Sequence, residues 1–143
     1  NFFDIAKGYP FGIVKDNAEC IVRDPLMVNE KGELICVGEL EDNTLVDILN
    51  GNKHSLIEAA KMAAEESANA AVLPQKAIII DCISRILFLE EDFDLELKEI
   101  TDTIKNKFPE ISIGGALTLG EISSYGEGFL EFYNKTVVVG LFE

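Results

Sequence analysis

Charged side chains that follow apolar segments are the residues of this sequence that could carry chemistry. Arg85 comes three residues after the end of the most hydrophobic segment, and Glu121 follows a later apolar segment with Tyr125 just beyond it. A guanidinium and a carboxylate held side by side can bind the two ends of a zwitterion through charge-assisted hydrogen bonds. Together with Arg23 and Asp24, which follow an earlier apolar run, these residues predict a site for a small polar metabolite.

The same residues also fit a purely structural role. Arg85 and Glu121 could form a salt bridge with each other, and Asp81 lies beside the same apolar segment as Arg85. On spacing alone the salt bridge is the more common outcome for such a pair. Both interpretations therefore stay open at the level of sequence.

Cysteine catalysis is the enzymatic alternative. Cys82 ends the most hydrophobic segment, and the nearby Arg85 could lower the pKa of its thiol. Such an enzyme also needs a base, and the one histidine of the chain, His54, stands at the predicted start of a helix, where an exposed side chain is expected. The sequence has neither metal ligands at suitable spacing nor a glycine pattern typical of phosphate binding. We therefore expect no enzyme, no metal ion and no cofactor.

The charge of the chain limits its partners. Its 12 Lys and Arg residues against 26 Asp and Glu residues give a formal net charge of −14, which repels nucleic acids and anionic membranes. No apolar run approaches the roughly 20 residues needed to cross a bilayer, and no leader pattern opens the chain. Three cysteines without C-x-x-C spacing suit a reducing compartment. We expect a cytoplasmic protein that binds neither nucleic acid nor membrane and, since it begins at Asn1, an excised or processed fragment.

Short strands are predicted at both ends of the chain, where apolar runs alternate with polar turns. The predicted strands are 11–14, 20–22, 27–28, 34–37, 45–49, 112–119 and 136–142, with a loop over 120–134 before the last of them.

Two helices and a central strand are predicted in the middle. The first helix begins at Ser55, which forms a capping-box pattern with Glu58, and it ends before Pro74. The second spans 92–107, with apolar residues at helical spacing and acidic residues at its start. The β-branched run Ala77–Ile80 between them is typical of a strand buried on both faces, and we expect the two helices to flank it. The order predicts one α+β domain over residues 1–143, with a mixed, mostly antiparallel sheet.

Several of these segments together resemble the FIST C-terminal domain, the second half of the FIST sensory module. The resemblance covers nearly the whole chain and is carried by Gly8-Tyr9-Pro10-Phe11-Gly12-Ile13, Val22-Arg23-Asp24-Pro25-Leu26, Cys82-Ile83-Ser84-Arg85, Gly120-Glu121-Ile122 and Asn134-Lys135-Thr136-Val137. Each segment alone is weakly specific, whereas their order and separation together are specific.

The resemblance implies a function that composition does not supply. FIST modules are sensory input domains of bacterial signalling proteins, proposed to bind small ligands such as amino acids. The resemblance also implies two partners, an N-terminal half of the module and a signalling output domain. The family motif falls on Arg23, Asp24, Cys82, Arg85, Gly120, Glu121, Asn134 and Thr136. Of these we take Arg23, Asp24, Cys82, Arg85, Glu121 and Asn134 as ligand-binding candidates, and Tyr125 lies in a segment that varies in the family.

We expect a non-catalytic sensory domain in which Arg85 holds the anionic group of the ligand and Glu121 holds its amine. The alternative is a protein-interaction module that docks the N-terminal half or another partner through a sheet edge or its acidic surface. A homodimer would fit that alternative.

Overall fold

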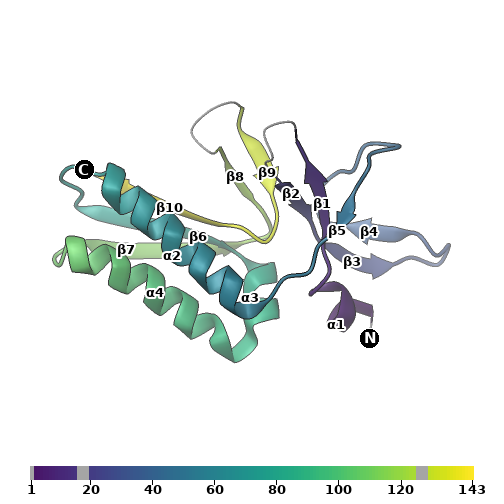
Figure 1. Cartoon of the computed structure of the whole chain (residues 1–143), viewed down its shortest axis with the longest axis horizontal. Helices are drawn as coiled ribbons and strands as arrows, with labels where there is room; N and C mark the ends of the chain where they lie inside the picture. Colours follow the sequence, from purple (N-terminus) through teal and green to yellow (C-terminus); the bar gives the residue numbers. More distant parts are fainter. Residues whose placement is uncertain (1, 16–19, 125–128) are drawn as a thin grey trace.

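The computed structural model of the chain describes residues 2–15, 20–124 and 129–143. These residues form an α+β fold, as predicted (Figure 1). The helices are α1 (Phe2–Ala6), α2 (Lys53–Ala70), α3 (Ile83–Leu89), the short 3-10 helix η1 (Glu90–Asp92) and α4 (Phe93–Lys107). The strands are β1 (Phe11–Val14), β2 (Cys20–Arg23), β3 (Pro25–Val28), β4 (Leu34–Cys36), β5 (Asp47–Ile48), β6 (Lys76–Cys82), β7 (Ser112–Thr118), β8 (Glu121–Ser123), β9 (Glu131–Tyr133) and β10 (Val137–Phe142).

One half of the molecule, termed the helical lobe, is the sheet β10-β6-β7 with α2, α3, η1 and α4. Strand β6 is central, parallel to β7 and antiparallel to β10. Helices α2 and α4 pack against each other on one face of this sheet (Figure 1). The β-branched run is therefore the central strand, as the sequence predicts.

The expectation that this strand is covered on both faces is wrong. Alternate residues of β6 point to opposite faces, so Ala77 and Ile79 are buried under the helices while Ile78 on the other face is 40% exposed. Both helices pack on the same face because their buried stripes also pack against each other. Gly114 of β7 pairs with Ile78 on the exposed face, and a side chain added there would meet open space.

The main hydrophobic core lies between this sheet and the helices. Ala60 and Ala64 of α2 and Ile100 and Ile104 of α4 are each completely buried and form one cluster with Ile79. Alanine has the smallest apolar side chain, so α2 can lie close to α4 and to the sheet. This core is what the helical periodicity of the sequence predicts.

Helix α2 begins earlier than predicted. Its N-cap is Asn52, whose side chain accepts a hydrogen bond of 2.8 Å from the backbone N–H of Ser55. Ser55 therefore lies in the first turn and is not the cap. Asn and Ser are both good caps, so local pattern did not distinguish them.

The other half of the molecule, termed the β lobe, contains α1 and strands β1 to β5. Its two sheets are β2-β1-β5 and the hairpin β3-β4, whose turn contains Gly32 at a φ of 82°. The hairpins β1-β2 and β3-β4 are confirmed. The larger side chains of β3 and β4 are exposed, namely Leu26, Met27, Val28, Leu34 and Ile35.

Five short elements differ from the prediction. The strand expected over 45–49 is shorter than predicted, because only Asp47–Ile48 (β5) forms a strand. The loop expected over 120–134 contains the antiparallel pair β8-β9. Helices α1 and α3 were not predicted. Helix α3 follows β6 directly, has no side-chain cap and is apolar, so its sequence lacks the usual signals of a helix start.

The strands form four separate sheets in the described residues rather than the single mixed sheet that we expected. None of the helices in the described part of the chain is long and apolar enough to cross a membrane.

Candidate functional site

Buried polar side chains gather at the ends of several strands. Among the described residues, the buried polar or charged side chains are Arg23, Asp24, Asp81, Arg85, Glu96, Glu121 and Asn134, and we term these seven the strand-end cluster. Burying so many polar groups is costly unless each has a partner. Their partners therefore decide what the cluster can do.

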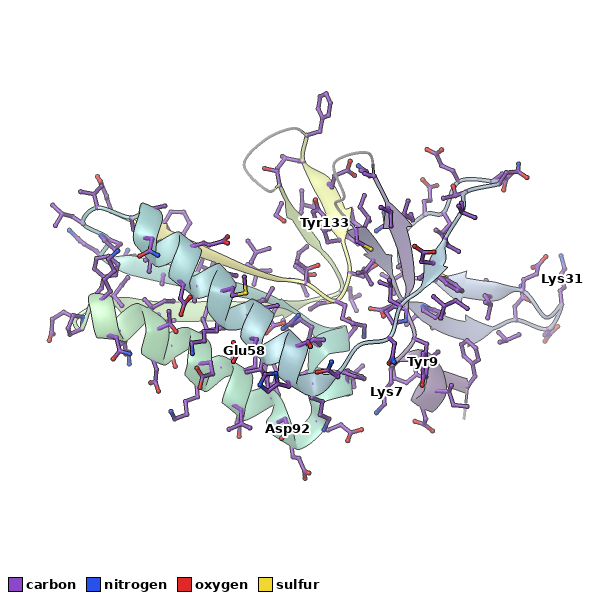
Figure 2. The ribbon with its side chains drawn as sticks, in the orientation of Figure 1. Lys7, Tyr9, Lys31, Glu58, Asp92 and Tyr133 are labelled. Carbon is purple, nitrogen blue, oxygen red and sulfur yellow. The ribbon has the colours of Figure 1, made fainter. Side chains whose placement is uncertain are left out.

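The β8-β9 hairpin places the cluster at the border of the two lobes. Strand β8 contacts β6 and β10 of the helical lobe, whereas β9 contacts β2 of the β lobe. Figure 2 shows Tyr133 of β9 between the lobes. A second link joins the lobes through Lys7. Its Nζ donates one hydrogen bond to Glu90 Oε1, at 2.5 Å, and another to the carbonyl of Leu87, at 3.2 Å.

Arg85, on α3, is bonded entirely to protein groups. Its Nε donates to Glu96 Oε1 at 3.1 Å, and its Nη2 donates to Glu96 Oε2. Nη2 also donates to the carbonyl of Leu56 at 2.8 Å, and Nη1 donates to the carbonyl of Lys135 at 3.2 Å. The structure thus pairs Arg85 with Glu96 of α4, and not with Glu121 as the salt-bridge interpretation supposed.

Asp81 faces the same guanidinium without bonding to it. Its Oδ1 lies 3.5 Å from Arg85 Nε, but that N–H points at Glu96, so neither oxygen of Asp81 accepts a hydrogen bond. The neighbouring Glu96 carboxyl is close enough to share a proton with it. Burial, and then the charge of Glu96, raise the pKa of Asp81 to about 7. Two neighbouring carboxylates repel unless one holds a proton. Asp81 therefore exchanges its proton near neutral pH.

Glu121 stands at the start of β8, where Gly120 allows a close approach of the chain. A Cβ on Gly120 would lie 2.2 Å from the ring of Phe132. The hydroxyl of Thr118 donates to Glu121 Oε1 at 2.6 Å, while Oε2 has no partner. Burial raises the pKa of Glu121, and the Thr118 hydroxyl opposes this shift. Oε2 therefore accepts no hydrogen bond, although the backbone N–H of Thr136 and the thiol of Cys82 lie close enough to the carboxylate to lower its pKa.

Asn134 and Lys135 follow β9 at the border of the two lobes. Asn134 Nδ2 donates to the carbonyl of Leu119 at 3.3 Å, and its Oδ1 has no partner. Lys135 Nζ lies 3.2 Å from Asp24 Oδ1, without hydrogen-bond geometry, and 5.4 Å from the ring centre of Phe88. Asp24 is therefore neutralised by Lys135 but not hydrogen-bonded.

The contacts of Arg23 and Cys82 fit a structural role rather than ligand binding. Arg23 donates to the carbonyls of Glu39 and Phe132 at 3.0 and 2.9 Å, and its guanidinium lies 5.7 Å from the centre of the Phe132 ring. Cys82 is 1% exposed, and its Sγ lies 3.2 Å from Ser84 Oγ. Burial raises the pKa of Cys82, the opposite of what a nucleophile needs. The exposed His54 lies in the first turn of α2, as predicted.

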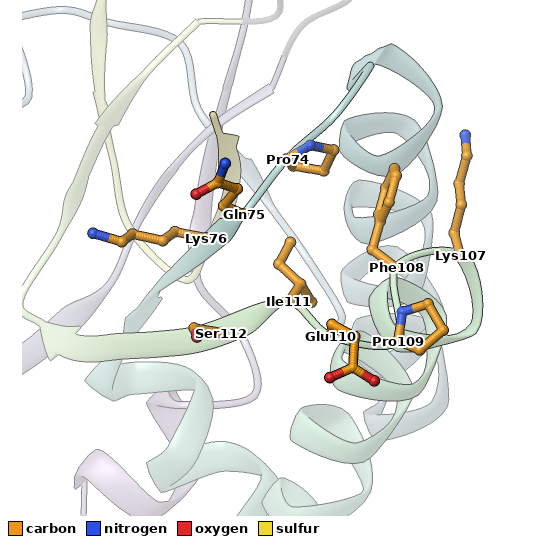
Figure 3. A pocket seen from close by; sticks show the side chains of 9 residues that line it. All are labelled: Pro74, Gln75, Lys76, Lys107, Phe108, Pro109, Glu110, Ile111 and Ser112. Carbon is orange, nitrogen blue, oxygen red and sulfur yellow. The ribbon is translucent and has the colours of Figure 1, made fainter.

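An open groove of 550 Å³ lies far from these residues. It is lined by the ends of α4 and β7 and by the segment entering β6, including Gln75, Lys76 and Phe108 (Figure 3). Lys76 starts β6 and Cys82 ends it, so about 20 Å of strand separates the groove from the strand-end cluster. In the described ranges, no group of three or more His, Cys, Asp or Glu residues is placed to hold a metal ion.

A protein-family model described as the FIST C domain matches residues 1–124. The chain belongs to the FIST C domain family. FIST C domains are sensory domains of signalling proteins, are generally not catalytic and pair with a FIST N domain. No curated protein and no solved structure matches the chain significantly. The FIST C match includes Arg85 and Glu121 and ends before Asn134.

Five of the candidates from sequence belong to the cluster of this FIST C domain, namely Arg23, Asp24, Arg85, Glu121 and Asn134. Cys82 is buried beside them, and Tyr125 lies outside the described residues. Sequence reasoning missed the role of Glu96, which is completely buried. The helix dipole alone explains an acidic residue in the first turn of a helix, so no other role is assigned to Glu96 from the sequence. The signal available was its position four residues before the buried Ile100, on the apolar face of α4.

Proposed function

We propose that this FIST C domain senses a small polar metabolite, such as an amino acid, at the strand-end cluster and carries out no catalysis. In open α/β sheets, ligands bind beyond the carboxyl ends of the parallel strands. Asp81 and Thr118 stand at those ends of β6 and β7, and Glu121 follows them. Glu121 would receive the amine of the ligand.

The observation that supports this proposal is a group of buried oxygens without partners. Both oxygens of Asp81, Oε2 of Glu121 and Oδ1 of Asn134 are buried and accept no hydrogen bond from the protein. Unpaired buried polar atoms are rare in folded proteins because each costs about 1–3 kcal/mol. A guest that donates hydrogen bonds to them would recover this free energy.

For Arg85 to hold the anionic group of a zwitterion, it would have to give up part of its bond with Glu96. Removal of Arg85 would leave Glu96 buried without a counter-charge, which is strongly destabilising. An Arg85 variant therefore cannot separate ligand binding from folding. Glu121 is the better position for a test, because Glu121→Gln keeps the shape of the side chain and removes its charge.

The test is a thermal-shift titration with a panel of amino acids and related metabolites. We expect at least one ligand to raise the Tm of the chain by several degrees at about 100 times its Kd. Glu121→Gln should lose most of this shift, whereas Glu110→Gln, an exposed carboxylate at the far end of β7, should keep it. No shift with any member of the panel would contradict the proposal.

The uncovered face of the helical-lobe sheet favours a second function, docking of a protein partner. Ile78 and Phe142 on this face are 40% and 55% exposed. Strand β7 pairs only with β6 among the described strands, so its other edge offers backbone groups for β-augmentation. The FIST N domain is the partner that family membership suggests.

Mixing the chain with a FIST N domain in gel filtration tests this second function. A stable complex that is lost in Ile78→Asp, and kept in Ile48→Asp on the β lobe, would support docking through the sheet face. Ile48 is a fair control because it is 71% exposed and lies in the other lobe. A complex that tolerates Ile78→Asp would place the partner elsewhere.

A further inference from the structure

The unpartnered atoms of the strand-end cluster share one chemical property. In the described part of the chain, every buried side-chain polar atom without a hydrogen-bond partner is an oxygen, and these oxygens belong to Asp24, Asp81, Glu121 and Asn134. Amide and carboxylate oxygens accept hydrogen bonds, and an ionised carboxylate cannot donate. With its carboxylates ionised, the cluster therefore lacks donors for these oxygens.

The cationic side chains nearby do not make up for this lack. Each nitrogen of the Arg85 guanidinium already donates to Glu96 or to a backbone carbonyl. Lys135 Nζ is held between Asp24, at 3.2 Å, and the carbonyl of Ser84, at 3.5 Å. A guanidinium has five N–H groups and four of those of Arg85 are used, so Arg85 cannot grip the carboxylate of a guest with two parallel hydrogen bonds without breaking an existing contact.

The buried charges also leave a negative excess. The cluster contains the four acidic side chains Asp24, Asp81, Glu96 and Glu121. The cationic side chains beside them are Arg23, Arg85 and Lys135. One negative charge is left over when all four acids are ionised, and either a proton or a monovalent cation can balance it.

An ammonium group has three donors and one positive charge, which are the two features that the cluster lacks. We infer that the strand-end cluster recognises the ammonium group alone, so that its ligands are primary amines as a class, with or without a carboxylate. This inference rests on the proposed function because it concerns the same site. It differs from the proposed function in that Arg85 takes no part in recognising the ligand.

Entry of the amine must be coupled to a change of packing. The unpartnered oxygens are buried away from solvent, so a guest reaches them only when contacts between the β8-β9 hairpin and the end of β6 open. A ligand that binds only the opened arrangement shifts the population toward it, which is what a sensory domain requires.

Binding should also depend on pH through competition with a proton. The groups facing Asp81 are Arg85 from α3, Glu96 from α4 and Glu121 from β8. Because the pKa of Asp81 is about 7, an amine competes with a proton below neutral pH and meets an ionised carboxylate above it. The affinity for an amine should rise about tenfold between pH 6 and pH 8.

The test is isothermal titration calorimetry of the whole chain with matched probes. Leucine, isoamylamine and 4-methylpentanoate form one set, and alanine, ethylamine and propanoate form a second. We expect each amine to bind within about threefold of its amino acid, and each acid to give no binding. Glu121→Gln should weaken amine binding at least about tenfold, and Glu110→Gln should leave it unchanged. If Glu121→Gln fails to fold, Asp81→Asn replaces it and should also abolish the pH dependence.

The outcomes separate this inference from the proposed function. Amino acids that bind while their amines bind more than about tenfold weaker would show that a carboxylate is read. The inference would then be wrong, and the proposed function would stand. If neither amines nor amino acids of either set bind, this inference is contradicted, and the wider metabolite panel decides whether the proposed function stands.

Discussion

The two lobes of this molecule differ in how they are held together. The helical lobe has the main hydrophobic core, with Ile100 and Ile104 completely buried between two helices and a sheet. In the β lobe the buried apolar residues are few among the described positions, with Ala6 and Ile21 as examples, and the large side chains of β3 and β4 are mostly exposed. A two-stranded hairpin without a covered face is marginally stable alone.

The difference shows what the strand-end cluster does for the fold. Lys135 contacts Asp24 of the β lobe, while its carbonyl accepts from Arg85 of the helical lobe. Arg23 at the end of β2 donates to the carbonyl of Phe132 on β9. The β lobe is thus fixed to the helical lobe by buried polar contacts as much as by its own packing. A change in these contacts alters how the lobes are joined, which suits a sensory domain.

The largest effect is expected at the buried ion pair. Glu96→Ala leaves Arg85 buried without its carboxylate and should lower the free energy of unfolding by about 3–5 kcal/mol. Glu99→Ala on the same helix removes only a partly exposed pair with Lys61, at 3.5 Å, and should cost less than about 1 kcal/mol. Chemical denaturation of both variants gives the comparison. Equal losses of unfolding free energy would mean that the buried ion pair stabilises the fold no more than the exposed pair does.

A matched pair of isoleucines tests where the stability resides. Ile100→Ala empties space in the core of the helical lobe and should cost about 3 kcal/mol. Ile48→Ala in the β lobe, where the side chain is 71% exposed, should cost less than about 0.5 kcal/mol. Urea denaturation measures both, and a larger loss for Ile48→Ala would reverse the contrast between the lobes.

The pH dependence of stability tests the border between the lobes. Because the pKa of Asp81 is raised from 3.8 to about 7, the folded protein binds this proton more tightly than the unfolded chain. The stability that this proton confers is complete below the unfolded pKa and is lost as the pH rises through about 7. Asp81→Asn cannot ionise, so its stability relative to the unsubstituted chain should rise by about 2 kcal/mol between pH 5 and pH 8. A constant difference between the two proteins would contradict the raised pKa.

The smallest effect is expected at the start of α2. Asn52→Ala removes the cap of the helix and should cost about 1 kcal/mol. Ser55→Ala should cost much less, because Ser55 contributes its backbone N–H to the cap. Thermal unfolding distinguishes the two, and a larger loss at Ser55 would restore the cap predicted from the sequence.

Regular elements could be predicted from the sequence because their signals are local. The spacing of Ile100 and Ile104 predicts the buried face of α4, and the β-branched run of β6 predicts a central strand. Short elements such as α3 and β8 could not be predicted, since few residues carry the signal and tertiary contacts stabilise them. The candidate site was found in part for a similar reason, because polar residues that follow apolar segments are visible in sequence.

The sequence by itself determined which residue types stand at the strand ends and which of the longer segments form helices and strands. Only the tertiary structure decided that Arg85 pairs with Glu96 while Glu121 keeps an unpaired oxygen. The physical reason is that hydrophobic periodicity acts over a few residues, whereas a buried charge is paired with whichever opposite charge the packing of distant elements brings within reach. Arg85 and Glu96 meet because α3 and α4 pack together, and no local pattern records that contact.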